Sequence, residues 1–445
     1  MQYSWKWLGA VGLLALNINT LNAQSKSDST PVVTLSLPQV LAKATAYSKV
    51  IKIADLKVAA SEKEVRDASA AILPEISVRG NLERATNMAM YEDGLFQSPT
   101  QRDIINTRYK IGGEAYFNLY NGNKTTLKIA AENTRQQMIR EQRNLTASEI
   151  KLRAVTRYLD IQQSSIFRNL LIKDIADQEK QLAQIKDFQQ NGLVLNSDVL
   201  RAELKLSRLK MSLLQLENDI TIASQKLNIL IGEAENFRVN PIEDTDPGSV
   251  PLNTHEDYIA AAISHSYLTK VSGQEVALSK IKVKEIKGNL APKTGLYAEY
   301  NYAYPQISLY PYAATPYGLG VIGIKAAFPV SGFYHNKNKV QAAQLASEQQ
   351  IMEHADLEEN IRQQVNEAWL RYKEDLQRIE VAVANVAQAT ENFRIVNNTY
   401  FNQTSLITDL LDADVQLLQT KFELASSQIA ARLQYYKLQY IIGEL

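Results

Sequence analysis

Residues 191–233 read NGLVLNSDVLRAELKLSRLKMSLLQLENDITIASQKLNILIGE, and residues 402–444 read NQTSLITDLLDADVQLLQTKFELASSQIAARLQYYKLQYIIGE. The two stretches align without a gap, so that Asp198 corresponds to Asp409 and both stretches end in Ile-Gly-Glu. Weaker matches continue upstream of both. Self-similarity at a fixed spacing is typical of a repeated structural unit. The chain is therefore predicted to contain two internal repeats.

The two repeats are expected to span residues 24–240 and 254–445, with a linker at 241–253 between them. The linker is assigned from its prolines, which interrupt helices and strands. Each repeat has the same order of patterns: a helix, two strand-like segments, a very long helix, a turn and a second long helix. This order predicts a mixed α and β chain in which long helices dominate.

Long helices are predicted from the absence of helix breakers and from the apolar spacing. No Gly or Pro occurs between Lys124 and Gln190, so one helix there could run about 100 Å at about 1.5 Å per residue. After the turn, apolar or small residues recur at alternating gaps of three and four, which predicts a coiled-coil seam. The helices are expected at 36–72, 123–190 and 196–231 in the first repeat, and at 254–289, 335–401 and 407–443 in the second.

The last helix of each repeat carries its apolar residues in a different register. The first seam begins Val199, Ala202, Leu206, Leu209, Leu213, and the second stripe is Val415, Leu418, Phe422, Ala425, Ile429. Two registers favour helices that pack on two sides, as in a ring of helices. A plain antiparallel coiled-coil rod, which needs only one seam, stays open as the alternative.

Between the helices, four segments alternate apolar and polar residues with a period of two. They are expected as strands at about 74–87, 107–119, 292–304 and 318–330. Alternating segments of about ten residues are typical of transmembrane β-strands, and tyrosines gather at 297, 300, 302, 304, 310, 312 and 317, as in an aromatic girdle at a membrane interface. In this reading Ile324 faces lipid and Ala327 faces the lumen. A soluble sandwich edge rich in tyrosine is the alternative.

Four strands in one chain cannot close a barrel. An open sheet edge in lipid leaves backbone N–H and C=O groups unpaired, at several kcal/mol each, so closure requires more than one chain. A dimer would supply eight strands and a trimer twelve, and both numbers occur in such barrels. The arithmetic alone does not choose between them.

The first 23 residues are predicted to be a secretory signal peptide. Lys6 precedes the apolar run from Leu8 to Leu16, and Ala23 provides a small residue before the expected cleavage site. No other apolar run reaches the 18 residues of a membrane-spanning helix.

Composition excludes several classes of protein and site. Forty-eight basic residues balance 48 acidic ones, so the overall charge gives no reason to expect nucleic acid as a partner. The absence of Cys excludes a disulfide scaffold, a thiol nucleophile and Cys-ligated zinc.

The motifs that could carry chemistry lack their structural context. Residues 318–323 (GLGVIG) match a dinucleotide-binding string, but they lead into a strand-like segment rather than opening a helix. The four histidines lack a zinc-binding spacing, and no G-x-S-x-G hydrolase motif occurs in the chain. We therefore expect no catalytic residues, no cofactor and no metal site, and the protein is not expected to be an enzyme.

Several of these motifs resemble those of one family, the TolC-type outer-membrane efflux proteins. The resemblance is carried by the duplicated turn (NGLVLNSDVL at 191–200), by LPEISV at 73–78 and by the Ile-Gly-Glu that ends each repeat. It implies a homotrimer in which each chain gives four strands to a twelve-stranded β-barrel, continuous with a long α-helical coiled-coil tunnel. The barrel would lie in the lipid of the outer membrane of a Gram-negative bacterium, and the tunnel would extend into the periplasm.

The expected function is a passive exit duct of a tripartite efflux or type I secretion system, for small molecules or secreted polypeptide. The resemblance implies a periplasmic adaptor (membrane-fusion) protein and an inner-membrane pump as partners. The alternative is a periplasmic coiled-coil structural or adaptor protein without a barrel. The four alternating segments separate the two hypotheses, because a rod does not need them.

The resemblance also implies a gate at the periplasmic entrance. Asp409 and Asp412 lie three residues apart at the start of a helix, so both side chains occupy one face. They correspond to the family's D-x-x-D, where rings of acids would narrow the pore and favour cations. The alternative is that these acids only cap the helix and match its dipole.

The hairpin turns are expected to hold the coils together and to contact the adaptor, through Gly192, Asp198, Tyr400 and Ser405. Tyr400 is expected to hydrogen-bond Asp198 of the other hairpin. The second turn departs from the first at Gln403, which stands where the first repeat has Gly192.

Overall fold

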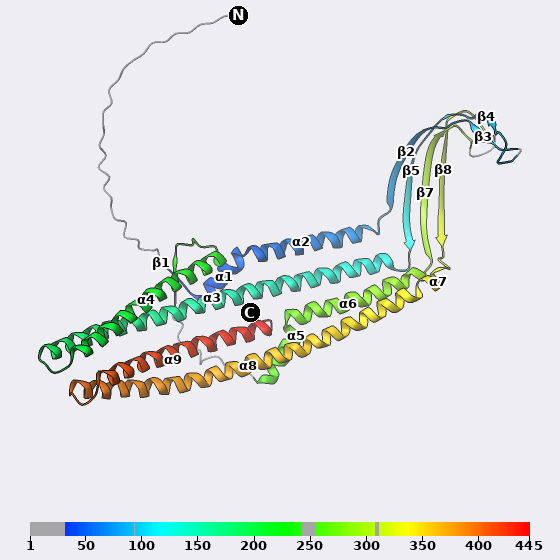
Figure 1. Ribbon diagram of the computed structural model, residues 1–445. Coiled ribbons are helices and arrows are strands. Elements are labelled where there is room, and N and C mark those ends of the chain that lie inside the picture. The colour runs from blue at the N-terminus through cyan, green and yellow to red at the C-terminus, as the bar shows by residue number, and fades with distance from the viewer. Residues whose placement is uncertain (1–31, 93, 243–253, 308–310) are drawn as a thin grey trace, which may run out of the picture.

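The computed structural model describes residues 32–92, 94–242, 254–307 and 311–445 as a long helical rod with a sheet at one end (Figure 1). The predicted signal peptide and most of the predicted linker lie outside the described residues. Two helical hairpins run side by side along the rod, and their turns lie at the end opposite the sheet. The fold therefore separates a β end from a helical end by the length of the longest helices.

The long helices follow the predicted pattern. In the first half of the chain they are α3 (Lys124–Gln190) and α4 (Asn196–Ile231), and in the second half α8 (Lys337–Phe401) and α9 (Ile407–Ile441). The 67 residues of α3 span about 100 Å. Among the described helices, none has an apolar stretch long enough to cross a bilayer.

The predicted helices at 36–72 and 254–289 are each broken into two, which corrects the prediction. The pieces are α1 (Leu37–Tyr47) and α2 (Lys49–Ala70), and α5 (His255–His265) and α6 (Tyr267–Lys287), followed by the 3-10 turn η2 (Gly288–Leu290). Ser48 and Ser266 stand at the breaks with extended ψ angles of 118° and 131°. Both serines are buried, and the Ser48 hydroxyl accepts the backbone N–H of Ile51 at 3.4 Å, as an N-cap does.

The Ile-Gly-Glu that ends each long hairpin packs against these breaks. Gly232 has a φ of +77°, and a Cβ there would overlap the ring of Tyr47, just before Ser48. Gly443 has a φ of +80°, and a Cβ there would meet the carbonyl oxygen of His265, just before Ser266, at 2.5 Å. Only glycine combines a positive φ with such a close approach.

The four predicted strands form one antiparallel sheet. They are β2 (Glu75–Arg84), β5 (Thr107–Tyr120), β7 (Lys293–Tyr304) and β8 (Tyr317–Ala327), paired in the order β2-β5-β7-β8. Strands β5 and β7 come from different halves of the chain, and their pairing joins the halves at the sheet. A short helix, α7 (Gly332–His335), leads from the sheet into α8.

Two small strand pairs were not predicted. Strand β1 (Val32–Leu35) pairs in parallel with β6 (Arg238–Pro241), and β3 (Met88–Met90) pairs with β4 (Thr100–Arg102). The predicted linker therefore starts too early, because Pro241 still belongs to β6.

Among the described residues, buried apolar side chains gather in three clusters along the rod rather than in one central core. The first lies where α1, α3, α4, β1 and β6 meet, and its Tyr158 hydroxyl donates to the Leu35 carbonyl at 3.0 Å. The second lies between α5, α8 and α9. The third joins the ends of the two hairpins and consists of Ile185, Val199, Ala202, Tyr400, Ile407 and Leu410.

Candidate functional site at the sheet and the hairpin ends

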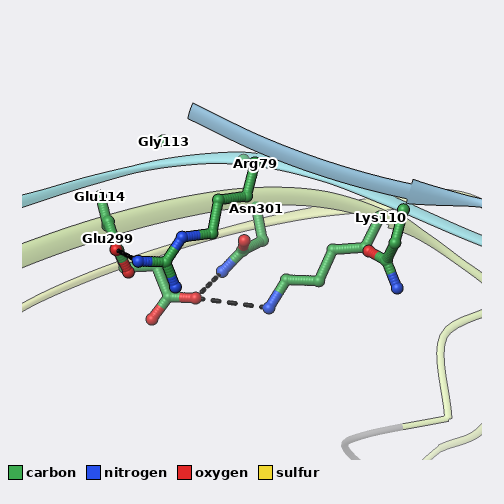
Figure 2. A pocket seen from close by; sticks show the side chains of 8 residues that line it. Arg79, Lys110, Gly113, Glu114, Glu299 and Asn301 are labelled. Carbon is green, nitrogen blue, oxygen red and sulfur yellow. Dashed lines mark hydrogen bonds and ion pairs between the residues drawn. The ribbon is translucent and has the colours of Figure 1, made fainter. Parts of the chain in front are cut away.

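One face of the sheet is polar and carries paired charges. Residues from β2, β5 and β7 line a cavity of about 180 Å³ there (Figure 2). Glu299 accepts from Lys110 at 3.4 Å and also from Asn301, while Glu114 forms an ion pair with Arg79. The register places the two acids Glu114 and Glu299 directly opposite each other, and Arg79 and Lys110 neutralise them from offset positions on neighbouring strands.

The other face of the same sheet is apolar. The register places Ile76 and Val78 of β2 on the same side as Leu296 of β7 and Ile322 and Ile324 of β8. Val78 is 75% exposed, Ile324 70% and Ile322 85%. Contiguous exposed apolar surface of this kind marks a contact with lipid or with another protein.

The two hairpin turns have the same backbone shape but different sequences. Gly192 has a φ of +71°, and Gln403 at the equivalent position has a φ of +60°. A left-handed conformation is strained for a residue with a side chain, and the second turn adds hydrogen bonds around it. Ser405 accepts from the Thr399 hydroxyl at 3.2 Å, and the Thr404 hydroxyl donates to the Thr399 carbonyl at 2.9 Å.

Asp409 and Asp412 are both exposed, at the start of α9. The Asp409 carboxylate accepts the backbone N–H of Leu406 at 3.2 Å. Asp409 therefore caps the helix, as the alternative reading expects. Within the described part of the chain, Asp412 has no such capping bond.

Tyr400 lies against the other hairpin but does not make the expected hydrogen bond. Its ring is buried in the third cluster, and its hydroxyl is buried without a hydrogen-bond partner. Burial, with the negative charge of Asp198 adding to it, raises the pKa of Tyr400 to about 12. The two residues are brought near each other, and the prediction of a Tyr400–Asp198 hydrogen bond is wrong.

Contacts between α3 and the second hairpin run along the rod. Phe188 packs edge-on against Phe401 with ring centres 5.5 Å apart, and Phe167 packs against Phe422 at 4.4 Å. Hydrogen bonds donated by side-chain amides alternate with these ring contacts along α3. Gln163 donates to the Ser426 hydroxyl at 3.0 Å, and Gln181 donates to the Asn397 side-chain oxygen at 3.3 Å.

A buried group of polar and charged residues lies between the hairpins, and it was not identified from the sequence. We call it the inter-hairpin charge cluster: Asp174 and Gln178 of α3, Lys205 of α4 and Asp414 of α9. Asp414 and Lys205 form an ion pair with side chains only 5% and 11% exposed. Asp414 lies four residues after Leu410 and three before Leu417, at a position of the helix where the spacing predicts a buried apolar residue. An acid at such a position is the sequence feature that could have indicated a buried charge.

Within the described residues, no group of three or more His, Asp or Glu side chains is placed to hold a metal ion.

Comparison with known proteins shows a likeness of fold. No protein-family model matches the chain, and no curated protein matches it in sequence. Among solved structures, the outer membrane protein VceC from Vibrio cholerae aligns at a TM-score of 0.74 and 15% identity, over 92% of this chain and 96% of that one. The outer-membrane channel OprN aligns at 0.76 and 13%, over 92% and 90%.

A third structure is the open state of the Neisseria gonorrhoeae MtrE outer membrane channel, which aligns at a TM-score of 0.72 and 14% identity, over 92% of this chain and 88% of that one. The chain has the fold of these channels over nearly its whole described length. The TolC-type resemblance of the sequence is thereby confirmed as a resemblance of fold.

Proposed function

We propose that this chain, which has the fold of outer-membrane channels, is itself the outer-membrane channel of a tripartite efflux or type I secretion system. It would act as a passive exit duct in the outer membrane of a Gram-negative bacterium and extend into the periplasm. The observation that carries the proposal is the four-stranded sheet with one apolar and one charged face, at the end of a helical rod about 100 Å long.

Barrel closure by three chains is part of the proposal. The outer edges of β2 and β8 have no neighbouring strand among the described residues, and unpaired edges in lipid are costly. Three copies would pair these edges into a twelve-stranded homotrimeric barrel. The charged face with Arg79, Lys110, Glu114 and Glu299 would line the lumen, and the apolar face would contact lipid.

The helical end offers a matching surface for neighbouring copies. Exposed apolar residues follow one side of α4, at Leu200, Leu204, Met211, Leu214, Ile222 and Ile229. Their spacing keeps them on a single stripe about 45 Å long at about 1.5 Å per residue. In a closed ring of helices, which would form the tunnel, this stripe would be buried against the next chain.

We assign the periplasmic gate to Asp409 and Asp412, and contacts with an adaptor to the exposed parts of the hairpin turns around Gly192, Asp198 and Ser405. An inner-membrane pump would supply the energy and select the cargo. The alternative, a periplasmic rod or adaptor, leaves the apolar face of the sheet without a role.

Replacing both Asp409 and Asp412 by Asn should weaken the cation selectivity of the channel in planar bilayers, together with block by multivalent cations. Asn removes both charges but can still accept the Leu406 N–H and cap the helix, so the thermal stability of the oligomer should hardly change. Wild-type and doubly substituted protein would be compared by reversal potential in a salt gradient. Unaltered selectivity and block would leave these acids with a capping role alone, and a wild type that forms no pore would contradict the proposed function.

Epitope tags at Ser98 and at Ala314 should be reachable by antibody on intact cells. Both residues are exposed in the segments that connect the paired strands, β2 to β5 and β7 to β8, at the end of the sheet away from the helices. A tag in the turn after Gly192, at the far end of the rod, is the matched control and should react only after lysis. Labelling of Ser98 and Ala314 only after lysis would contradict the barrel.

A further inference from the structure

The inter-hairpin charge cluster takes its groups from both hairpins. The Lys205 ammonium of α4 pairs with Asp414 of α9 and also donates to the Leu411 carbonyl at 3.4 Å. From α3, the Gln178 side-chain amide donates to the same Asp414 oxygen at 2.9 Å. One carboxylate oxygen of the second hairpin thus receives donors from both helices of the first hairpin.

Asp174 is a second carboxylate in this cluster, one helical turn before Gln178 on α3. Its Oδ2 atom is fully buried and has no hydrogen-bond partner. The charged groups that act on it are Lys205 of α4, Asp414 and Lys421 of α9, and Asp177 on its own helix. The buried carboxylate of Asp414 and the half-buried carboxylate of Asp174 are therefore both attracted to the Lys205 ammonium, which forms its ion pair with Asp414.

We propose that the inter-hairpin charge cluster is a pH-dependent contact, in which a proton on Asp174 holds the two hairpins together more tightly in acid. With Asp174 protonated, the buried charges of Asp414 and Lys205 balance. With Asp174 ionised, an extra negative charge without a hydrogen-bond partner lies beside Asp414, and moving the hairpins apart hydrates it.

The direction of the effect follows from the titration of Asp174. Burial, with the negative charge of Asp414 adding to it, raises the pKa of Asp174 to about 6, although Lys205 and Lys421 act in the opposite sense. An unperturbed Asp titrates near about 3.9. Because the packed state binds the proton more strongly, this contribution is fully present below about pH 4 and is lost as the pH rises through about 6. The hairpins should therefore be packed more tightly at about pH 5 than at about pH 7.5.

Hydrogen exchange of the full-length oligomer tests the proposal. Exchange of the backbone amides around the cluster, in peptides covering 175–205 and 405–420, would be measured at both pH values and corrected for intrinsic rates. We expect the equilibrium constant for opening of the hairpin contact to increase about tenfold from pH 5 to pH 7.5. The largest possible increase is about 100-fold, because the pKa of Asp174 differs by about two between the packed and the open state. Asp174→Asn should remove this difference and keep the high protection at pH 7.5.

Asp177→Asn is the matched control, because it also removes one negative charge from α3, three residues after Asp174. The Asp177 side chain is exposed and forms an ion pair with Lys180. It should keep the pH difference of the wild type. Equal protection at both pH values in the wild type, or loss of the pH difference in Asp177→Asn as well, would overturn the proposal. Asp174→Ser serves if the Asn variant fails to fold. Hydrogen exchange does not depend on conductance. The proposed charge cluster can therefore be contradicted while the proposed channel function stands, and the channel function can be contradicted while the charge cluster stands.

Discussion

Replacing Ile324 by lysine should sharply reduce the amount of oligomer assembled in the outer membrane. Ile324 lies opposite Leu296 on the apolar face of the sheet, and its side chain is 70% exposed in the single chain. A lysine on the lipid face of a barrel costs about 2 to 4 kcal/mol near the middle of the bilayer. In a homotrimer each chain would carry this cost, so the free-energy cost for the whole assembly would be three times that of one chain. Outer-membrane fractionation followed by electrophoresis without heating measures the surviving oligomer.

Val321→Lys on the same strand is the matched control. Val321 lies three residues from Ile324 but on the charged face, directly opposite Glu299. A lysine there would face water in the lumen and an opposite charge across the strands, which is favourable or neutral. Assembly should therefore be close to that of the wild type. Equal loss at Ile324 and Val321 would contradict the assignment of the two faces.

The four long strands and four long helices could be predicted because their patterns are long and local. Each strand alternates over about ten residues, and α3 contains no glycine or proline over its 67 residues. The breaks at Ser48 and Ser266 could not be predicted this way. Neither serine adjoins a glycine or proline, and each break is matched by a distant glycine, Gly232 or Gly443, that packs beside it.

The small strands were missed for a related reason. Strand β1 has only four residues, and its partner β6 lies about two hundred residues further along the chain. A run of four residues gives little periodicity, and nothing local indicates so distant a pairing. Strands β3 and β4 are shorter still, with three residues each.

The residues of the hairpin ends were identified from the repeated turn, but their contacts were not. Tyr400 was placed correctly beside the first hairpin, yet its hydroxyl is buried without a partner instead of bonding Asp198. The charged link between the hairpins is made instead by Lys205 and Asp414, further from the turns. Sequence periodicity shows which side of a helix is buried, but not which polar residues on that side meet across an interface.

Replacing Asp414 by alanine should be the most damaging single change at the hairpin end of the rod. It would leave the Lys205 ammonium buried, with only the Leu411 carbonyl at 3.4 Å as an acceptor, and would remove the partner of Gln178. Removing one member of a buried ion pair typically costs about 3 to 5 kcal/mol. Hydrogen exchange of amides on both sides of the cluster should then speed up by at least about 100-fold, since about 1.4 kcal/mol corresponds to a factor of ten.

The double substitution Lys205→Met with Asp414→Leu separates the charge effect from simple loss of packing. Both replacements fill similar volumes with apolar groups, and replacing a whole buried ion pair in this way is often neutral or stabilising by about 1 to 4 kcal/mol. The double variant should therefore be more protected than Asp414→Ala and close to the wild type, and a double-mutant cycle gives the coupling between the two residues. If the double variant were as poorly protected as Asp414→Ala, the cost would come from packing at α9 rather than from an unpaired ammonium. In the double variant Asp174 would also lose both the repulsion of Asp414 and the attraction of Lys205, while burial, Lys421 and Asp177 would still act on it. The pH dependence of exchange should survive there, because burial is the largest cause of the raised pKa of Asp174.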